Sequence, residues 1–285
     1  MADPGSSPET LGVGYSSCPN DTFIFHALVS GIVETPGVRW RPIIEDVEAL
    51  NARAFAREIP VTKISFHALG HLRGSYALLA SGAALGRGCG PLIVARDASV
   101  AARLASARVA IPGARTSAAL LLRLREPRIR PENLIVMTFD RILDAVSGGE
   151  VDAGLIIHES RFTYAARGLV SLEDLGSWWE GESGLPIPLG GIIADRRLGA
   201  PRIRDIEMAL RRSVVHARRH PDASREYVRS HAQELSEDVT RAHIALYVND
   251  FTEDLGEEGL RAVQALFEAA EARGIVPRYG GPIGV

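Results

Sequence analysis

Three observations predict an α/β protein with two lobes joined by a hinge. From Leu11 to about Ala194, short apolar runs alternate with segments of helical periodicity, which is typical of β-α-β units with parallel strands. Two such series follow one another and are joined by the apolar runs "PLIVAR" and "GGIIAD". From Arg202 to Arg273 the composition shifts to Ala, Glu, Arg and Leu, and three or four amphipathic helices are expected with little strand signal.

In this layout the chain forms most of one lobe, continues into a second lobe, and then returns to complete the first. We expect residues 11–94 and 195–285 to form the first lobe and residues 95–194 the second. The chain has 285 residues, of which 46% are hydrophobic, so it can bury a sizeable core. Residues 1–10, "MADPGSSPET", are rich in Pro, Ser and Gly and are expected to be a disordered tail.

The elements of the first series are justified by their apolar period and by helix-capping and turn residues. Asn20 or Asp21 would cap the first helix and Gly31 would end it, because short polar side chains favour N-caps and Gly favours helix ends. The expected order is strand "LGVGYS", helix "NDTFIFHALVSG", helix "DVEALNARAFA", strand "VTKIS", helix "FHALGHL" and strand "YALLAS". "ALGRGCGPLIVAR" follows as a glycine-rich hinge turn and a further strand.

The second series repeats this alternation and ends in an unusual way. Its expected elements are strand "ARVAIPG", helix "TSAALLLRLRE", strand "NLIVMTF", helix "DRILDAVSGG" and a buried strand that ends at His158. "GGIIAD" is the last strand, and Pro221 and Gly256 mark helix ends in the region beyond it.

Charge and cysteine content exclude several classes of function. The 32 basic and 35 acidic residues give a net charge of −3 with no long block of either sign, so no nucleic acid is expected as a partner. Cys18 and Cys89 lack the spacing of a disulfide framework or a zinc site. No leader and no apolar span of membrane length is evident, which predicts a cytoplasmic protein that works without a membrane. A homodimer is compatible with the sequence.

His158 is the main catalytic candidate. A histidine at the carboxyl end of a buried strand would face the cleft between the lobes, where ligands of open α/β sheets bind. There it could act as a base near neutral pH. The alternative is a structural histidine that bonds to a backbone carbonyl. Glu159 and Arg161 would either orient the ring or pair with each other.

Two stretches are suited to binding an anion. Thr116 and Ser117 stand at a strand-to-helix junction, where backbone N–H groups and hydroxyls converge, although an ordinary N-cap is the alternative. Lys63 and Ser65 end another strand, and Lys63 could instead cover apolar surface. Cys18 is interpreted as a small buried residue because no base lies beside it in the sequence. No complete motif for a metal or a nucleotide is found, so no cofactor is expected.

Several of these stretches resemble the 1,4-dihydroxy-6-naphthoate synthase family of the futalosine route to menaquinone. The resemblance rests on "SSCPNDTFIFHALV", "EDVEALN", "VTKIS", "GAALGRGCGPLIVAR" and "AGLIIHESRFTY", and it extends from about Leu11 to Arg273. It implies a fold similar to the periplasmic binding proteins of the second type. It also implies a cofactor-independent lyase that converts cyclic dehypoxanthinyl futalosine, a small carboxylate, to 1,4-dihydroxy-6-naphthoate with release of dihydroxyacetone.

The resemblance also implies roles for particular residues. His158 stands where the family has its proposed proton acceptor, and the family's ligand-lining stretches match Lys63, Ile64, Ser65, Thr116 and Ser117. Asn20, in the "SCPNDTF" motif, is a further candidate for substrate binding. The family's second threonine is Ser117 here, which keeps the hydroxyl and loses a methyl group. Two other readings share the fold: chorismate dehydratase of the same pathway, and a non-enzymatic solute-binding protein.

Overall fold

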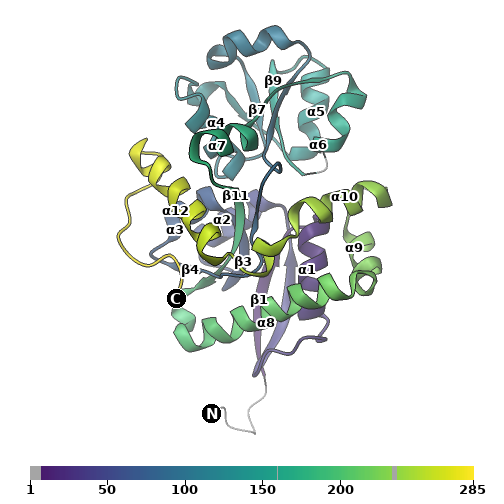
Figure 1. Ribbon diagram of the computed structural model, residues 1–285, viewed down its shortest axis with the longest axis vertical. Helices are drawn as coiled ribbons and strands as arrows, with labels where there is room; N and C mark the ends of the chain where they lie inside the picture. The colour runs from purple at the N-terminus through teal and green to yellow at the C-terminus, as the bar shows by residue number, and fades with distance from the viewer. Residues whose placement is uncertain (1–7, 159, 233–235) are drawn as a thin grey trace.

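The computed structural model describes residues 8–158, 160–232 and 236–285, and it has two lobes, each built around one β-sheet (Figure 1). The sheet of the first lobe has the strand order β2-β1-β3-β11-β4, and β5 pairs with β11 beside this path. Its strands are β1 (Glu9–Tyr15), β2 (Val38–Ile44), β3 (Val61–Ser65), β4 (Tyr76–Leu78), β5 (Ala84–Gly86) and β11 (Ile187–Asp195).

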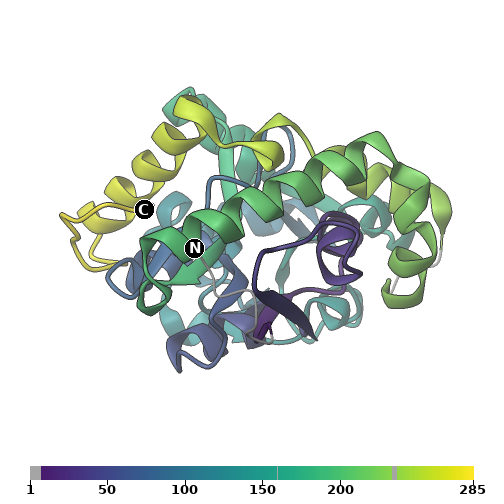
Figure 2. The same cartoon turned by 90° about the horizontal axis from the view of Figure 1, so that it is seen from below.

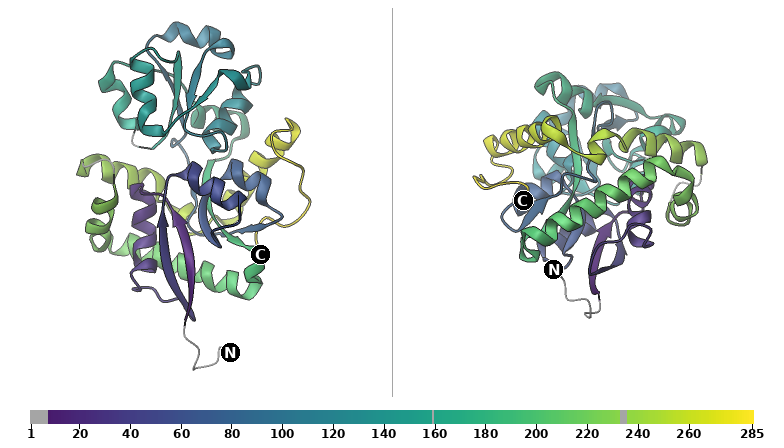
Figure 3. Two further views of the ribbon diagram at one scale, coloured as in Figure 1. Left: turned by 180° about the vertical axis from the view of Figure 1, so that it is seen from behind. Right: turned by 60° about the horizontal axis from the view of Figure 1, so that its bottom comes forward.

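The sheet of the second lobe has the order β10-β6-β9-β7-β8. Its strands are β6 (Leu92–Ala95), β7 (Val109–Ile111), β8 (Leu134–Val136), β9 (Ala153–Ile156) and β10 (Val170–Asp174). In the first lobe β1 is parallel to β2 and β3, and in the second lobe β7 is parallel to β8 and β9. The two-lobed shape is also evident from behind (Figure 3).

Helices cover both sheets. The helices that follow strands along the chain are α1 (Pro19–Val29), α2 (Val47–Phe55), α3 (Phe66–Leu72), α4 (Ser117–Arg125), α5 (Phe139–Ser147), α6 (Ser160–Thr163) and α7 (Leu175–Ser183). The carboxyl-terminal part contributes α8 (Ala200–Arg219), α9 (Arg225–His231), α10 (Glu237–Tyr247), α11 (Asp250–Glu253) and α12 (Gly256–Ala272). The long green helix α8 crosses the first lobe, as the view from below shows (Figure 2). No helix in the described ranges is long and apolar enough to cross a bilayer.

The α/β class and most of the predicted elements are confirmed, and several details differ. Glu9 and Thr10, expected in the disordered tail, belong to β1, and the start of the expected glycine-rich turn forms strand β5. Strand β2 was not predicted, because Arg39, Arg41 and Pro42 interrupt its apolar pattern, and a proline is tolerated on an edge strand such as this one. Strand β10 and helix α7 were also missed. The N-cap of α1 is Cys18, so Asn20 and Asp21 lie inside the helix. The region after residue 202 holds more α-helices than the three or four expected.

Strand pairing divides the chain differently from the expected lobes. The prediction placed residues 95–194 in the second lobe, whereas β6 begins the second sheet at Leu92 and β11 already pairs with β3 in the first sheet. Both strands are uniformly apolar, and apolarity alone does not indicate which sheet a strand joins. The chain therefore crosses between the lobes before Leu92 and again before Ile187.

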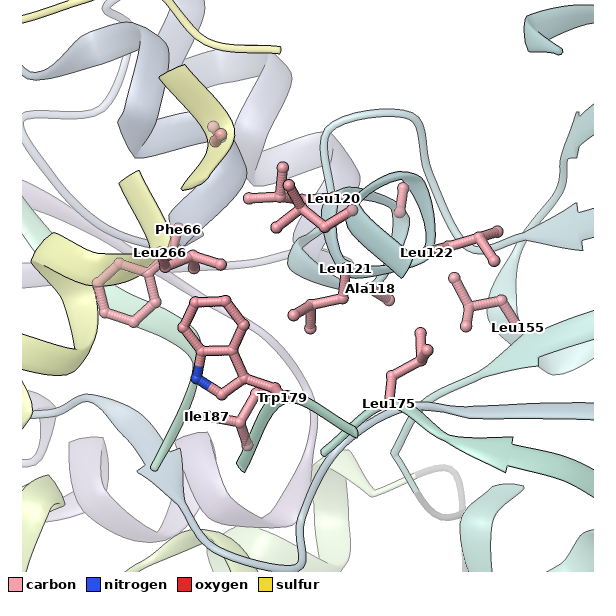
Figure 4. Close-up of a cluster of buried hydrophobic side chains, with 14 of the residues drawn as sticks. Phe66, Ala118, Leu120, Leu121, Leu122, Leu155, Leu175, Trp179, Ile187 and Leu266 are labelled. Atoms are coloured by element: carbon pink, nitrogen blue, oxygen red, sulfur yellow. The ribbon is translucent and has the colours of Figure 1, made fainter. Parts of the chain in front are cut away.

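A single hydrophobic cluster extends through both lobes at one side of the junction. Phe66 of α3 and Leu266 of α12 lie beside Trp179 of α7, and the leucines of α4 and Leu155 of β9 continue the cluster into the second lobe (Figure 4). The labelled side chains are all buried. The two lobes therefore share part of their core, and α4 is packed against the first lobe as well as its own.

The first crossing segment lies in direct contact with the start of α7. A Cβ atom added at Gly90 would lie 2.2 Å from the backbone nitrogen of Gly176, so only glycine allows the two backbones to approach this closely. Arg161 of α6 links the same crossing segment to Asp174. Its guanidinium donates to the carbonyl oxygens of Gly88 and Gly90 and to Oδ2 of Asp174, at 2.7 Å for the last contact.

Candidate active site

The parallel strands of both sheets end at one cleft. β1 and β3 end at it from the first lobe and β9 from the second, and α10 lies across its side. In open α/β folds, ligands bind in the crevice at the carboxyl ends of the strands. The empty volume of the cleft, with the open solvent at its mouth included, is about 680 Å³. All seven predicted site residues line it: Asn20, Lys63, Ile64, Ser65, Thr116, Ser117 and His158.

The wall formed by the first lobe is built on a buried ion pair. Lys63 Nζ lies 2.6 Å from Asp21 Oδ1, and both side chains are less than a tenth exposed. Burial alone would raise the pKa of Asp21, but Lys63 and the hydrogen bonds from Ser16 lower it overall. Lys63 is therefore not a surface lysine. Its ammonium keeps two further N–H donors, and the charge of Asp21 balances its own.

Ser65 is held by a side chain of α2. Its backbone N–H donates to Asn51 Oδ1 at 3.0 Å, and its hydroxyl oxygen accepts from Asn51 Nδ2 at 3.2 Å. Asn51 Nδ2 also reaches the backbone oxygen of Arg115, at 3.4 Å, in the other lobe. Asn51 thus orients the end of β3 and links it to the loop before α4.

The wall formed by the second lobe is the amino end of α4. Thr116 Oγ1 accepts from the N–H of Ala119 at 3.2 Å and donates to the carbonyl of Gly113 at 2.8 Å, so this side chain is an N-cap. The hydroxyl of Ser117 donates to the carbonyl of Leu189 on β11. Both hydroxyl protons are thus engaged with backbone. The backbone N–H groups of Ser117 and Ala118 have no intrahelical acceptor, as at any helix start, and both residues line the cleft.

His158 follows β9 with an unusual backbone. Its φ is +57°, the left-handed region that residues other than glycine rarely adopt. Such a conformation costs on the order of 1–3 kcal/mol and is concentrated at functional sites. The backbone turns sharply here, between the end of β9 at Ile156 and the start of α6 at Ser160. Glu159, which was expected to orient the ring or pair with Arg161, lies outside the described residues.

The ring of His158 is surrounded by side chains from three other elements. Its Nδ1 lies 3.3 Å from the sulfur of Cys18, and its plane is nearly parallel to that of His243, at 6.1 Å between centroids. Phe139 packs edge-on at 5.0 Å. Burial lowers the pKa of His158 to about 4, although Asp21 opposes this shift. The imidazole is therefore neutral near pH 7 and can accept a proton.

Sequence reasoning missed three residues of the site. Asp21 was expected only as a cap. Cys18 was interpreted as buried filler without a neighbouring base, yet it contacts His158 through the fold, so only its burial was foreseen. His243 was not singled out, and its one signal in the sequence is that it shares a helix face with Tyr247 four positions later; both line the cleft. Arg161 bonds to Asp174 and the crossing segment.

No group of three or more metal-ligating side chains gathers anywhere in the described ranges. The polar groups of the cleft are an ion pair, hydroxyls, an amide and two neutral histidines. This donor set suits a small polar organic anion.

The fold and the cleft together define a protein of the periplasmic-binding-protein-like class. The alkanesulfonate-binding protein of Xanthomonas axonopodis pv. citri, solved with MOPS, has a TM-score of 0.68 over 96% of both chains at 16% identity. A protein of Archaeoglobus fulgidus has a TM-score of 0.87 at 37% identity, over 94% of this chain and 98% of its own.

The chain belongs to the menaquinone biosynthesis family, whose model matches residues 11–272. Two curated relatives are named 1,4-dihydroxy-6-naphthoate synthase. The relative from Thermus thermophilus is 52% identical, over 96% of this chain and 99% of its own. The relative from Streptomyces coelicolor is 47% identical, over 96% of this chain and 97% of its own.

Proposed function

We propose that this protein is a carbon–carbon lyase that converts cyclic dehypoxanthinyl futalosine to 1,4-dihydroxy-6-naphthoate and releases dihydroxyacetone. The observation that carries the proposal is a neutral, partly buried His158 at the end of β9, in a cleft lined by all the expected site residues. The names of the two curated relatives support the same reaction over chorismate dehydration. Work on a biosynthetic intermediate also fits a cytoplasmic location.

His158 is the proposed general base. Cleavage of a carbon–carbon bond in a hydroxylated ring begins when a base takes a hydroxyl proton, and aromatisation of the naphthoate then supplies driving force. A base with a pKa of about 4 is fully deprotonated at neutral pH. In the tautomer that this role requires, Nδ1 carries the ring proton and donates it to the Cys18 sulfur 3.3 Å away, and Nε2 has the free lone pair that faces the substrate.

The substrate carboxylate is assigned to the amino end of α4. The helix dipole and the N–H groups of Ser117 and Ala118 favour an anion there, whereas Lys63 is already paired with Asp21. Thr116 and Ser117 would then act mainly by holding this helix end in place, because their hydroxyl protons are directed to carbonyl oxygens. Lys63, Ile64 and Ser65 would form the opposite wall.

The test is turnover by the purified protein. We expect it to form 1,4-dihydroxy-6-naphthoate from cyclic dehypoxanthinyl futalosine, detected anaerobically by chromatography, and to leave chorismate unchanged. The matched control is His158→Ala, which keeps the cleft and removes the base. Dehydration of chorismate, or binding of the futalosine derivative without turnover, would contradict the proposal and favour one of the two other readings of the fold.

A further inference from the structure

His243 lies in the cleft wall but has no part in the proposed chemistry so far. It stands on α10, is 1% exposed, and packs between the ring of His158 and that of Tyr247, with centroids 6.1 Å and 4.7 Å away. A histidine buried this deeply is normally satisfied at both ring nitrogens.

The proton of His243 lies on Nε2. Asp21 is a carboxylate and can only accept, so the Asn20 atom 2.9 Å from it is the amide nitrogen Nδ2, which donates. Asn20 therefore presents its carbonyl oxygen Oδ1 to His243, and Nε2, at 3.1 Å, must donate to it. Burial, followed by the nearby His158, lowers the pKa of His243 to about 3, so the ring is neutral and carries only this proton.

Nδ1 of His243 is consequently an acceptor with its lone pair unused. No group among the described residues donates to it, and this atom is buried. Leaving a buried acceptor unsatisfied destabilises the folded protein. His243 lines the cleft together with His158, Tyr247, Asn20, Asp21 and Lys63.

We propose that His243 Nδ1 accepts a hydrogen bond from a hydroxyl group of the ligand, next to the hydroxyl that reacts at His158. This assignment rests on the proposed function, because it needs a hydroxylated ligand. His243 would then be a substrate-binding and specificity residue, and Asn20 would be the residue that sets its tautomer. An analogue without hydroxyls would leave Nδ1 unsatisfied.

Two substitutions separate the nitrogens. In His243→Gln the amide can replace Nε2 and keep the bond to Asn20, but nothing replaces Nδ1. In His243→Asn the shorter side chain places its carbonyl oxygen near the position of Nδ1 and loses the bond to Asn20. The probes are 1,4-dihydroxy-6-naphthoate and 2-naphthoate, which share the bicyclic carboxylate and differ in the two hydroxyls. Binding is measured anaerobically by calorimetry.

We expect the wild-type protein to prefer the dihydroxy compound. His243→Gln should lose roughly three- to tenfold of that preference while binding 2-naphthoate as the wild type does. His243→Asn should retain most of the preference but melt at a lower temperature. Equal preference in all three proteins, or equal weakening of both ligands by both variants, would reduce His243 to a packing residue.

A measurement on the unmodified protein covers the case in which a variant does not fold. The ¹⁵N resonance of His243 Nδ1 should move toward the hydrogen-bonded range with 1,4-dihydroxy-6-naphthoate and stay in place with 2-naphthoate. An unchanged resonance with both compounds bound would overturn the assignment alone. If the wild-type protein binds neither compound, the proposed function and this inference fall together.

Discussion

His158 combines three properties that a base in this reaction needs. Its position at a strand end brings it to the cleft, its burial keeps it neutral, and its φ of +57° turns the backbone sharply after the strand. The strained backbone is tolerated because β9 and the bond from the Arg161 N–H to the carbonyl of His158, at 3.3 Å, fix both sides of the turn.

Replacing His158 with Ala should remove catalysis and leave much of the ligand affinity. A base acts in the reaction step more than in ground-state binding, so we expect kcat to fall ~10²–10⁴-fold. Stopped-flow or steady-state kinetics checks the rate, and calorimetry with 1,4-dihydroxy-6-naphthoate checks binding. Near wild-type turnover in His158→Ala would remove this residue from the mechanism.

The acid limb of the rate profile should report the same group. Because burial lowers the pKa of His158 to about 4, the free enzyme loses its base only as pH falls through that value. We therefore expect kcat/KM to be flat from neutral pH down to about 5 and to decline near 4. Circular dichroism at each pH separates titration from unfolding. A limb near the ordinary histidine value of 6.5 would show that the pKa of the base is not lowered in the free enzyme.

Part of this site could be predicted from sequence. His158, Lys63 and Thr116 each end or follow a strand, and the predicted two-lobed layout directs the carboxyl ends of the strands of both sheets to one cleft, so the layout indicates that they meet. The contacts of Cys18 and His243 could not be predicted in this way. They depend on how α1 and α10 pack across the cleft, and tertiary packing leaves no local mark in the sequence.

At the scale of elements, α4 extends from the cleft into the core. Its amino end lines the cleft, and its leucines pack in the core shared by the lobes. This packing fixes the orientation of the helix and therefore of its first N–H groups. The residue Thr116 before it is extended, with φ −73° and ψ 150°, and caps the helix. This backbone suits a proline at the next position.

The pair Ser117→Pro and Ser117→Ala isolates one backbone donor. Both remove the hydroxyl that bonds Leu189, but only proline removes the N–H of residue 117. If that N–H holds the substrate carboxylate, we expect KM to be at least about tenfold higher in Ser117→Pro than in Ser117→Ala, because a bond to a charged group contributes roughly 1.5–3 kcal/mol. Equal KM values in the two variants would move the carboxylate to Lys63 and Ser65.

The Thr116→Ala variant is a separate test of the cap. Loss of an N-cap side chain costs about 1 kcal/mol, so a lower melting temperature is expected. An unchanged melting temperature would mean that the bond from Ala119 contributes nothing measurable.

The close backbone contact between Gly90 and Gly176 is a second feature at the scale of elements. Gly90→Ala would place a methyl group against the Gly176 backbone and displace the Gly90 carbonyl, which accepts a hydrogen bond from Arg161. Arg161 is only three residues after His158, so the change should also disturb the active site. We expect lower stability together with a loss of kcat. Gly181→Ala is the matched control. Gly181 lies in helix α7, as Gly176 does, and a Cβ atom added there meets nothing within 4 Å. Equal stability and kcat in Gly90→Ala and the control would show that the close approach is not required.

At the scale of the molecule, buried neutral histidines make the fold sensitive to acid. The pKa values of His67 and His158 are lowered to about 4 and that of His243 to about 3, in each case chiefly by burial. Below about pH 6.5 the unfolded chain takes up protons that the folded chain does not, so the free energy of unfolding falls as pH falls. Lowered carboxyl values such as that of Asp21 act in the same direction at lower pH.

Thermal melts between pH 7 and 4.5 should show this loss, and His67→Asn should reduce it. Asn can still donate to the carbonyl of Thr116, which His67 Nδ1 contacts at 3.3 Å, but it has no titrating ring. A slope of melting temperature against pH that is the same in His67→Asn and wild type would exclude His67 from the effect.

The shared hydrophobic cluster determines how the protein unfolds. It joins Phe66 and Leu266 to Trp179 and the leucines of α4. An independently folding second lobe would need its own closed core, but residues 92–183 excised alone would leave α4 and Trp179 uncovered on this side. The protein should therefore unfold in calorimetry as one cooperative transition, with equal calorimetric and van't Hoff enthalpies, despite its two-lobed outline. The excised segment should expose apolar surface and bind a hydrophobic dye.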